Sequence, residues 1–353
     1  MADSGMVMAT PVWEASALAA LLSAAALAAL VGLRRALPQD VPNARSLHAR
    51  RVPRAGGFAI WAGFIPAALL FPPSFPGGSA AWLVPWALLV VVSAWDDRRA
   101  VPVVPRLAVH AVAALWVGWK LVGHGAAASM MLPVPLALVG IAVIVVWASN
   151  LYNFMDGNDG LAATMGVIGF ASLGFASLGI ASTGFATRDS ASAPALFALA
   201  AAILPFLVVN RPPASMFLGD AGAVPLGFLA AAFGLEGVIA SRWPPWFPLL
   251  VFLPFVADAT YTLLRRALAR EAVWRAHRDH CYQRLNRLGA GHAGTLAVYA
   301  ALMAATSATA IACLQAARWA GAWALAVWTA VVLMLFAAID YHWRKNDKIA
   351  TTR

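Results

Sequence analysis

Amides, carboxylates and glycines stand together in the run Asn150–Gly160, which reads NLYNFMDGNDG. The run follows an apolar stretch, residues 136–148, and polar groups at the end of such a stretch are costly unless they bind something. Amide and carboxylate oxygens are the ligands that Mg²⁺ prefers, with phosphate oxygens completing its shell. The run therefore predicts a site for a divalent cation and a phosphate-bearing ligand, with helix capping by Asn and Asp as the alternative.

A second acidic group is the pair Asp96-Asp97 in the string SAWDDRRAVPVVPR. Adjacent carboxylates repel each other, so both stay ionised only beside a cation or in well-hydrated space. The pair is either a hydrated helix end that pairs with Arg98 and Arg99, or a part of the same cation site.

A third polar connection holds Asn210 and the string FLGD, which ends at Asp220. An aspartate at a helix start is unremarkable as an N-cap, so a metal role for Asp220 depends on its meeting Asn153. Phe217 could stack on a flat base, although phenylalanine in a membrane protein more often faces lipid or core.

The segment HRDHCYQRLNR, residues 277–287, places His277 and His280 three positions apart. Zinc is a poor explanation because no third ligand of the usual kind is nearby. The neighbouring arginines, among them Arg278, favour binding of phosphate or sugar hydroxyls, and attraction to anionic lipid headgroups is the alternative.

Membrane-spanning helices must position these groups. The 353 residues are 62% hydrophobic and 11% charged, whereas soluble domains are roughly 45–50% apolar and about 25% charged. The apolar stretches suit helices and lack the alternation of barrel strands. We therefore predict an all-α polytopic membrane protein with about 11 transmembrane helices. The predicted spans are 12–33, 57–74, 80–95, 105–121, 131–149, 160–180, 192–209, 221–240, 245–264, 293–314 and 320–339.

The basic residues favour one side of these spans. With the N-terminus outside (periplasmic), all but four of the 25 Lys and Arg lie on the inner side, the exceptions being Lys120, Arg188, Arg242 and Arg318. This asymmetry supports an odd number of spans and a cytoplasmic C-terminus. The polar clusters lie on the same face, which predicts a cytoplasmic active site. A transporter would instead place ionisable groups near mid-membrane. Nucleic acid is a poor partner, because the basic loops are short and lie beside membrane lipids.

Residues 1–353 are predicted to form a single integral membrane domain. The string GFASL occurs at 169–173 and again at 174–178, and its glycines and serines favour close helix packing over chemistry. Cys281 and Cys313 suggest neither a disulfide nor a thiol site.

Five strings together resemble the polyprenyl-phosphate N-acetylhexosamine-1-phosphate transferase family, which is glycosyltransferase family 4. They are NARSLHARRVPRAGGFAI at 43–60, DDRRAVPVVPRL at 96–107, NLYNFMDGNDGLA at 150–162, FLGDAGAVPLGF at 217–228 and DATYTLLRRALAREAVWRAHRDHCYQRL at 258–285. They follow the family's order, and the helix count and the outside N-terminus fit its sugar-transferring branch.

The resemblance implies a Mg²⁺-dependent phosphoglycosyl transferase of the bacterial inner membrane, with Mn²⁺ as a substitute ion. A UDP-linked N-acetylated sugar, such as GlcNAc, GalNAc, FucNAc or QuiNAc, would give its sugar 1-phosphate to undecaprenyl phosphate and release UMP. This reaction would start a surface polysaccharide such as the O-antigen of lipopolysaccharide, or a cell-wall glycan. Dimers are common in the family, which implies a homodimer.

The resemblance also implies roles by position. The catalytic positions are Asp96, Asp97 and Asp220, the first two as an acidic pair near the lipid phosphate. The metal-associated positions are Asn153 and Asp220. The nucleotide-facing positions are Asp156, Asp159, Asn210, Phe217 and Arg54. The positions that face pyrophosphate and sugar, in the cytoplasmic loop 265–292, are His277, Arg278 and His280. Asn150 belongs to the same motif as Asn153.

Two departures from the family's pattern matter. The branch that makes the peptidoglycan precursor has a denser histidine string than AHRDHCYQRL, which favours the surface-polysaccharide branch here. The repeat at 169–185 is unlike the family. The main alternative is a phospho-N-acetylmuramoyl-pentapeptide transferase, followed by a non-enzymatic transporter of lipid-linked sugars and a structural assembly protein.

Overall fold

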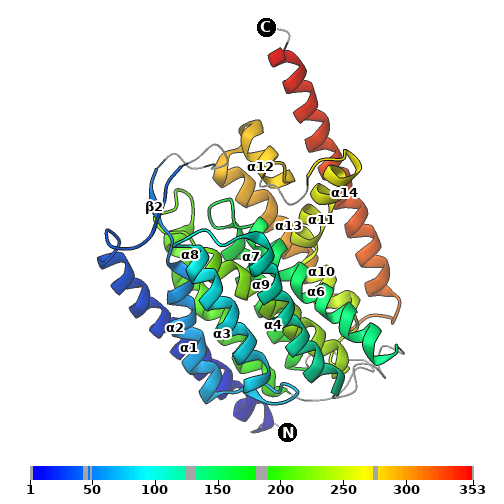
Figure 1. The fold of residues 1–353 in the computed structure, drawn as a ribbon. Helices are drawn as coiled ribbons and strands as arrows, with labels where there is room; N and C mark the ends of the chain where they lie inside the picture. The colour runs from blue at the N-terminus through cyan, green and yellow to red at the C-terminus, as the bar shows by residue number, and fades with distance from the viewer. Residues whose placement is uncertain are drawn as a thin grey trace.

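The computed structural model describes residues 3–42, 47, 50–123, 132–179, 190–272 and 277–351, which fold into a helical bundle (Figure 1). Seven described helices are long and apolar enough to cross a membrane, and two shorter apolar helices, Gly56–Leu70 and Leu161–Ser177, lie among them. The prediction of an all-α, multi-pass membrane protein is confirmed. The total of eleven spans and the direction of the termini stay predictions.

In chain order the helices are α1 (Asp3–Gly32), α2 (Gly56–Leu70), α3 (Ser79–Asp96), α4 (Val103–Gly123), α6 (Val134–Phe154), α7 (Leu161–Ser177), α8 (Ala193–Asn210), α9 (Asp220–Ile239), α10 (Trp246–Val251), α11 (Leu253–Leu268), α12 (Cys281–Leu285), α13 (Gly291–Cys313) and α14 (Ala320–Thr351). The shorter elements are η1 (Ser190–Ser192), η2 (Asn286–Ala290) and the antiparallel strands β1 (Gln39–Asp40) and β2 (Val52–Pro53).

Each predicted span overlaps a described helix, although the span 57–74 runs past the end of α2 at Leu70. Helix is expected because an apolar backbone in a membrane must satisfy its own hydrogen bonds. The stretch 245–264 differs from the prediction, since it is divided at Phe252 into α10 and α11. Residues 180–189, which include the end of the 169–185 repeat, lie outside the described residues.

Helix α9 is the most buried of the seven candidate spans in the described chain, and it packs against α2, α3, α4, α6 and α7. Small residues permit this close packing. A Cβ at Gly227 would lie 2.3 Å from the carbonyl oxygen of Ala148 on α6. The surrounding helices therefore fix α9, and with it Asp220 at its first residue.

The part of the repeat that lies within α7 supports the packing interpretation. A Cβ at Gly174 would lie 2.9 Å from the ring of Phe197 on α8, and one at Gly169 would lie 2.5 Å from the ring of Phe252. Gly169 and Gly174 thus make room for aromatic rings of neighbouring segments, whereas a Cβ at Gly179 would meet nothing within 4 Å.

The two ends of the bundle differ in what they carry. Strand β2, α12 and the projecting end of α14 lie at one end, called here the loop end, and α1 begins at the other (Figure 1). The far end of α9 holds a buried ion pair, in which Arg242 Nη2 lies 2.7 Å from Glu236 Oε1. Arg242 also donates to Ser192 Oγ at 3.3 Å, so this pair joins α9 to the start of α8.

We expect Arg242→Met to destabilise the bundle by about 3–5 kcal/mol, because it leaves the Glu236 carboxylate buried without its cation. The measurement is the thermal midpoint of the detergent-solubilised protein. Arg318→Met, at an exposed position, is the matched control and should leave the midpoint unchanged. Equal midpoints for the two variants would contradict the role of the pair.

Candidate active site

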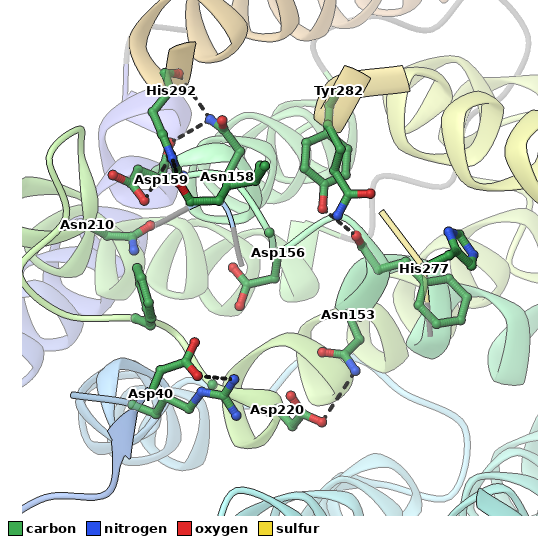
Figure 2. A pocket seen from close by; sticks show the side chains of 17 residues that line it. Asp40, Asn153, Asp156, Asn158, Asp159, Asn210, Asp220, His277, Tyr282 and His292 are labelled. Carbon is green, nitrogen blue, oxygen red and sulfur yellow. Dashed lines mark hydrogen bonds and ion pairs between the residues drawn. The ribbon is translucent and has the colours of Figure 1, made fainter. Parts of the chain in front are cut away.

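A polar cavity of about 310 Å³ lies at the loop end of the bundle (Figure 2). Segments far apart in the chain line it: the region of β1 and β2, the turn after α6, the connection from α8 to α9, and the segment from 277 to 292. Eight predicted site residues line the cavity: Arg54, Asn153, Asp156, Asp159, Asn210, Phe217, Asp220 and His277. The prediction that separate loops form one pocket is confirmed.

Asn153 and Asp220 meet in this cavity. Asn153 stands in the last turn of α6 and Asp220 begins α9, and the Asn153 amide donates to Asp220 Oδ2 at 3.4 Å (Figure 2). Arg106 Nη1 lies 3.9 Å from the same carboxylate oxygen. No described group of three or more His, Cys, Asp or Glu side chains could hold a metal ion. A cation here would therefore rely on few protein ligands, as Mg²⁺ commonly does when a substrate phosphate completes its shell.

Asp156 extends into the cavity between these two residues and the opposite wall (Figure 2). Burial, followed by the negative charge of Asp220, raises the pKa of Asp156 well above its ordinary value. The cavity thus gathers carboxylates whose mutual repulsion a bound cation would relieve. This donor set, one amide and two carboxylates, fits a hard divalent ion.

The acidic pair at the end of α3 does not line the cavity, and its second member, Asp97, supports α9. Asp97 accepts the backbone N–H of Asp220 on Oδ1 at 3.1 Å and that of Ala221 on Oδ2 at 3.0 Å. Burial raises the pKa of Asp97 even though these N–H groups lower it. Gly219, with φ +76°, precedes them, and a Cβ there would lie 2.9 Å from Asp97 Oδ2. A glycine is therefore required at the turn.

Asp96 accepts from Arg106 Nη1 at 2.6 Å and from the backbone N–H of Val101 at 2.7 Å. Of the two alternatives for the pair, binding to Arg98 and Arg99 is wrong, because Asp96 binds Arg106 on α4 and Asp97 binds the start of α9. The sequence did not reveal this contact, because Arg106 comes ten positions after Asp96 and approaches it only after the chain has turned into α4.

Two of the predicted nucleotide-facing residues, Asn210 and Asp159, form hydrogen bonds between segments of the cavity wall. The Asn210 side chain accepts the Gly160 N–H at 3.0 Å and donates to the Met216 carbonyl at 2.9 Å. Asp159 Oδ2 accepts the Ala214 N–H at 2.9 Å. These two residues join the turn after α6 to the connection from α8 to α9, and their direct contact with a nucleotide stays a prediction.

A backbone ladder brings Arg54 to the cavity. Phe217 N–H donates to the Pro53 carbonyl at 2.8 Å, and Gly56 N–H donates to the Phe217 carbonyl at 2.9 Å. The Arg54 guanidinium pairs with Asp40 at 2.9 Å. Phe217 is half-buried in the wall, so an aromatic face and a cation stand on the same side of the cavity.

The segment after residue 276 divides its polar groups between the cavity and the interior. His277 lines the cavity, and burial, followed by His280 and Arg266, lowers its pKa to about 4. His277 is therefore a neutral hydrogen-bonding group at pH 7. Arg278 is exposed, and neither it nor His280 lines the cavity. Residues 273–276 of the predicted loop lie outside the described residues.

His280 is buried, with Nδ1 3.4 Å from Asp258 Oδ1. Asp258 also accepts the backbone N–H groups of Cys281 at 2.8 Å and Tyr282 at 3.0 Å, so it fixes the start of α12. Arg284 pairs with Asp340 on α14 at 2.7 Å, and this contact ties α12 to the last helix.

Asn150 does not line the cavity. Its amide nitrogen donates to the Val146 carbonyl at 2.7 Å and lies 3.2 Å from His110 Nδ1 on α4. The two amides of the motif thus serve different neighbours, although both stand on α6.

Sequence reasoning did not single out several residues that line the cavity: Asp40, Leu47, Asn158, Tyr282, Gln283 and His292. Tyr282 donates from its hydroxyl to the Phe154 carbonyl at 2.9 Å, which places α12 over the end of α6. His292 stands next to the predicted span 293–314, and a polar residue at that boundary was the available signal.

Comparison with known proteins shows which proteins this chain is similar to. The family model described as glycosyl transferase family 4 matches residues 79–238. A probable undecaprenyl-phosphate N-acetylglucosaminyl 1-phosphate transferase of Bacillus subtilis is 24% identical over 85% of this chain and 82% of its own length. An undecaprenyl-phosphate alpha-N-acetylglucosaminyl 1-phosphate transferase of Yersinia pestis is 27% identical over 71% of this chain and 70% of its own. A phospho-N-acetylmuramoyl-pentapeptide-transferase of a Synechococcus strain is 36% identical over 37% of this chain and 36% of its own.

We expect Asp97→Ala to lower the thermal midpoint, because two partly buried N–H groups at the start of α9 lose their acceptor, at a cost of up to about 1–3 kcal/mol each. Asp97→Asn keeps one acceptor oxygen and should lose less. The midpoints of both variants in detergent measure the difference. A wild-type midpoint for the alanine variant would show that Asp97 does not hold α9.

Proposed function

Because the chain belongs to glycosyl transferase family 4, we propose that it transfers N-acetylglucosamine 1-phosphate from UDP-N-acetylglucosamine to undecaprenyl phosphate and releases UMP. The Bacillus subtilis and Yersinia pestis relatives carry N-acetylglucosamine and undecaprenyl phosphate in their names, which supports both assignments. A Mycobacterium tuberculosis relative that aligns over 71% of the chain names the same sugar with decaprenyl phosphate, so the sugar has the broader support. The pentapeptide-transferring relative aligns over 37% of the chain, so that alternative has less support.

One observation carries the proposal. Asn153 and Asp220 stand 67 positions apart in the chain and on different helices, yet their side chains lie 3.4 Å apart in the cavity. Arg54 and Phe217 line the same cavity, and they offer a cation for phosphate and a flat ring for a base. A nucleotide sugar carries both of these groups.

Asn153 and Asp220 would hold Mg²⁺, and Asp156, which lines the same cavity, would be the further ligand. When bound, Mg²⁺ neutralises the negative charge of the diphosphate and of the acceptor phosphate. The site would then hold two anionic substrates together, which is the main electrostatic task of this transfer.

The transfer would proceed by direct displacement. An oxygen of the lipid phosphate forms a bond to the sugar-proximal phosphorus, and the bond from that phosphorus to the UMP oxygen breaks as UMP leaves with the electron pair. A phosphate monoester has a second pKa of about 6 and is mostly a dianion at neutral pH, so the attack requires no strong base.

The contacts of the acidic pair support displacement over a covalent intermediate. Both oxygens of Asp97 accept backbone N–H groups, and Asp96 is bound to Arg106 and Val101, so each would have to leave its partners to act as a nucleophile. Asp97 would act by holding α9. A phosphorylated protein formed with the nucleotide sugar alone would contradict this mechanism.

The loop end would face the cytoplasm, where nucleotide sugars are available. The excess of Lys and Arg in the connections of that end supports this orientation. The start of α1 and the end of α14 lie at opposite ends of the bundle (Figure 1), as an odd number of spans requires. A role in initiating surface polysaccharide, and assembly as a homodimer, stay predictions.

We expect Asp220→Asn to abolish UMP release at limiting Mg²⁺, because it removes the charge that captures the ion. The assay contains purified protein, undecaprenyl phosphate and a panel of UDP-sugars, of which UDP-N-acetylglucosamine should be used fastest. Chelation with EDTA should stop the wild-type reaction, and added Mg²⁺ should restore it.

Glu14→Gln, at an exposed position on α1, is the matched control and should keep wild-type activity. Near-normal turnover of the Asp220 variant at limiting Mg²⁺ would rule out the metal role. Absence of UMP release by the wild type would favour a transporter or an assembly protein instead.

A further inference from the structure

His292 connects three segments of the cavity wall. Its ring Nδ1 lies 3.1 Å from Asp159 Oδ1 and 3.2 Å from the Asp159 backbone nitrogen. Its Nε2 lies 3.2 Å from the Leu47 carbonyl oxygen. Its own carbonyl accepts the Asn158 amide at 3.1 Å. One side chain at the start of α13 thus contacts the turn after α6 and Leu47.

The two neighbours of His292, Asn158 and Asp159, form hydrogen bonds with other parts of the protein. Asn158 donates to two carbonyls and accepts the Asn286 amide at 2.9 Å, and it is 3% exposed. Asp159 is held on its other oxygen by the Ala214 N–H. The His292 side chain, at 21% exposed, remains partly open to the cavity.

The two edges of the imidazole have different partners. Nε2 faces a carbonyl oxygen, so it must carry a hydrogen. Nδ1 faces both a backbone N–H and a carboxylate, so it can accept from the first or, when protonated, donate to the second. The Nδ1 edge therefore holds the turn at 158–160, and the Nε2 edge contacts Leu47.

His292 also stands apart from the residues that would bind the metal. In Figure 2, His292 and Asp159 lie on one side of Asp156, while Asn153 and Asp220 lie on the other. A disturbance at His292 should thus affect how the far part of the nucleotide sugar is held more than it affects the reacting phosphates.

We propose that His292 is a positioning residue for the nucleotide: its Nδ1 edge fixes Asp159 and the 158–160 turn, and this contact sets the affinity of the cavity for the uridine end of the donor. The inference rests on the proposed function for the identity of the ligand. It adds a residue from the start of α13 to a site otherwise assembled from the motifs before it.

Two isosteric variants separate the two edges of the ring. His292→Asn keeps an amide near the position of Nδ1 and loses the reach to Leu47, whereas His292→Gln keeps an amide near Nε2 and loses the group at Nδ1. His292→Ala loses both. His342→Asn, at an exposed histidine on α14, is the matched control.

We expect the Gln and Ala variants to raise the KM for UDP-N-acetylglucosamine, and the Kd for UMP, about tenfold or more, because a hydrogen bond to a charged group is lost. The Asn variant should stay within about threefold of the wild type. The kcat and the KM for undecaprenyl phosphate should change little in all three variants. Turnover is measured by UMP release, and UMP binding by calorimetry on the detergent-solubilised protein.

Equal losses in the Asn, Gln and Ala variants, or a fall in kcat with unchanged KM and UMP affinity, would overturn the inference. The binding arm keeps it separate from the proposed function. Suppose that the wild type binds UMP, and that the Asn and Gln variants differ in UMP affinity as expected, but that the wild type releases no UMP from the donor. That result would overturn the proposed function alone.

Discussion

The start of α9 is bound to the end of α3 through the Asp97 carboxylate, which accepts the N–H groups of Asp220 and Ala221. The first N–H groups of a helix have no partner within the helix, and at a membrane boundary they need one from elsewhere. Asp97 supplies both acceptors from a different helix. The position of the Asp220 carboxylate, and hence its meeting with Asn153, depends on this contact.

The same device recurs around the cavity. Asp258 accepts the N–H groups at the start of α12, and Asp159 accepts the N–H of Ala214 in the connection from α8 to α9. Charge-assisted bonds of this kind are stronger than neutral ones, particularly where water is scarce. Three carboxylates at the loop end, those of Asp97, Asp159 and Asp258, thus join segments that are distant in the chain. Asp97 and Asp258 do not line the cavity, whereas Asp156, Asp159 and Asp220 do.

This division changes how the acidic motifs are interpreted. A substitution at Asp97 or Asp159 removes activity if it displaces a helix start or a turn, even when the carboxylate never contacts a substrate. A substitution at Asp220 acts on the cavity directly. Loss of activity alone therefore does not distinguish a positioning residue from a catalytic one, and stability or binding has to be measured beside turnover.

The amino-acid sequence by itself determined the helices, because runs of apolar residues long enough to cross a bilayer have few other ways to satisfy their backbone. It also determined which residue types gather at one end, through the strings around Asn153, Asp220 and His277. Only the tertiary structure decided their partners. Hydrogen bonding acts over about 3 Å between groups that are far apart in the chain, and no local pattern encodes it. Arg106 beside Asp96, and His292 beside Asp159, are contacts of that kind.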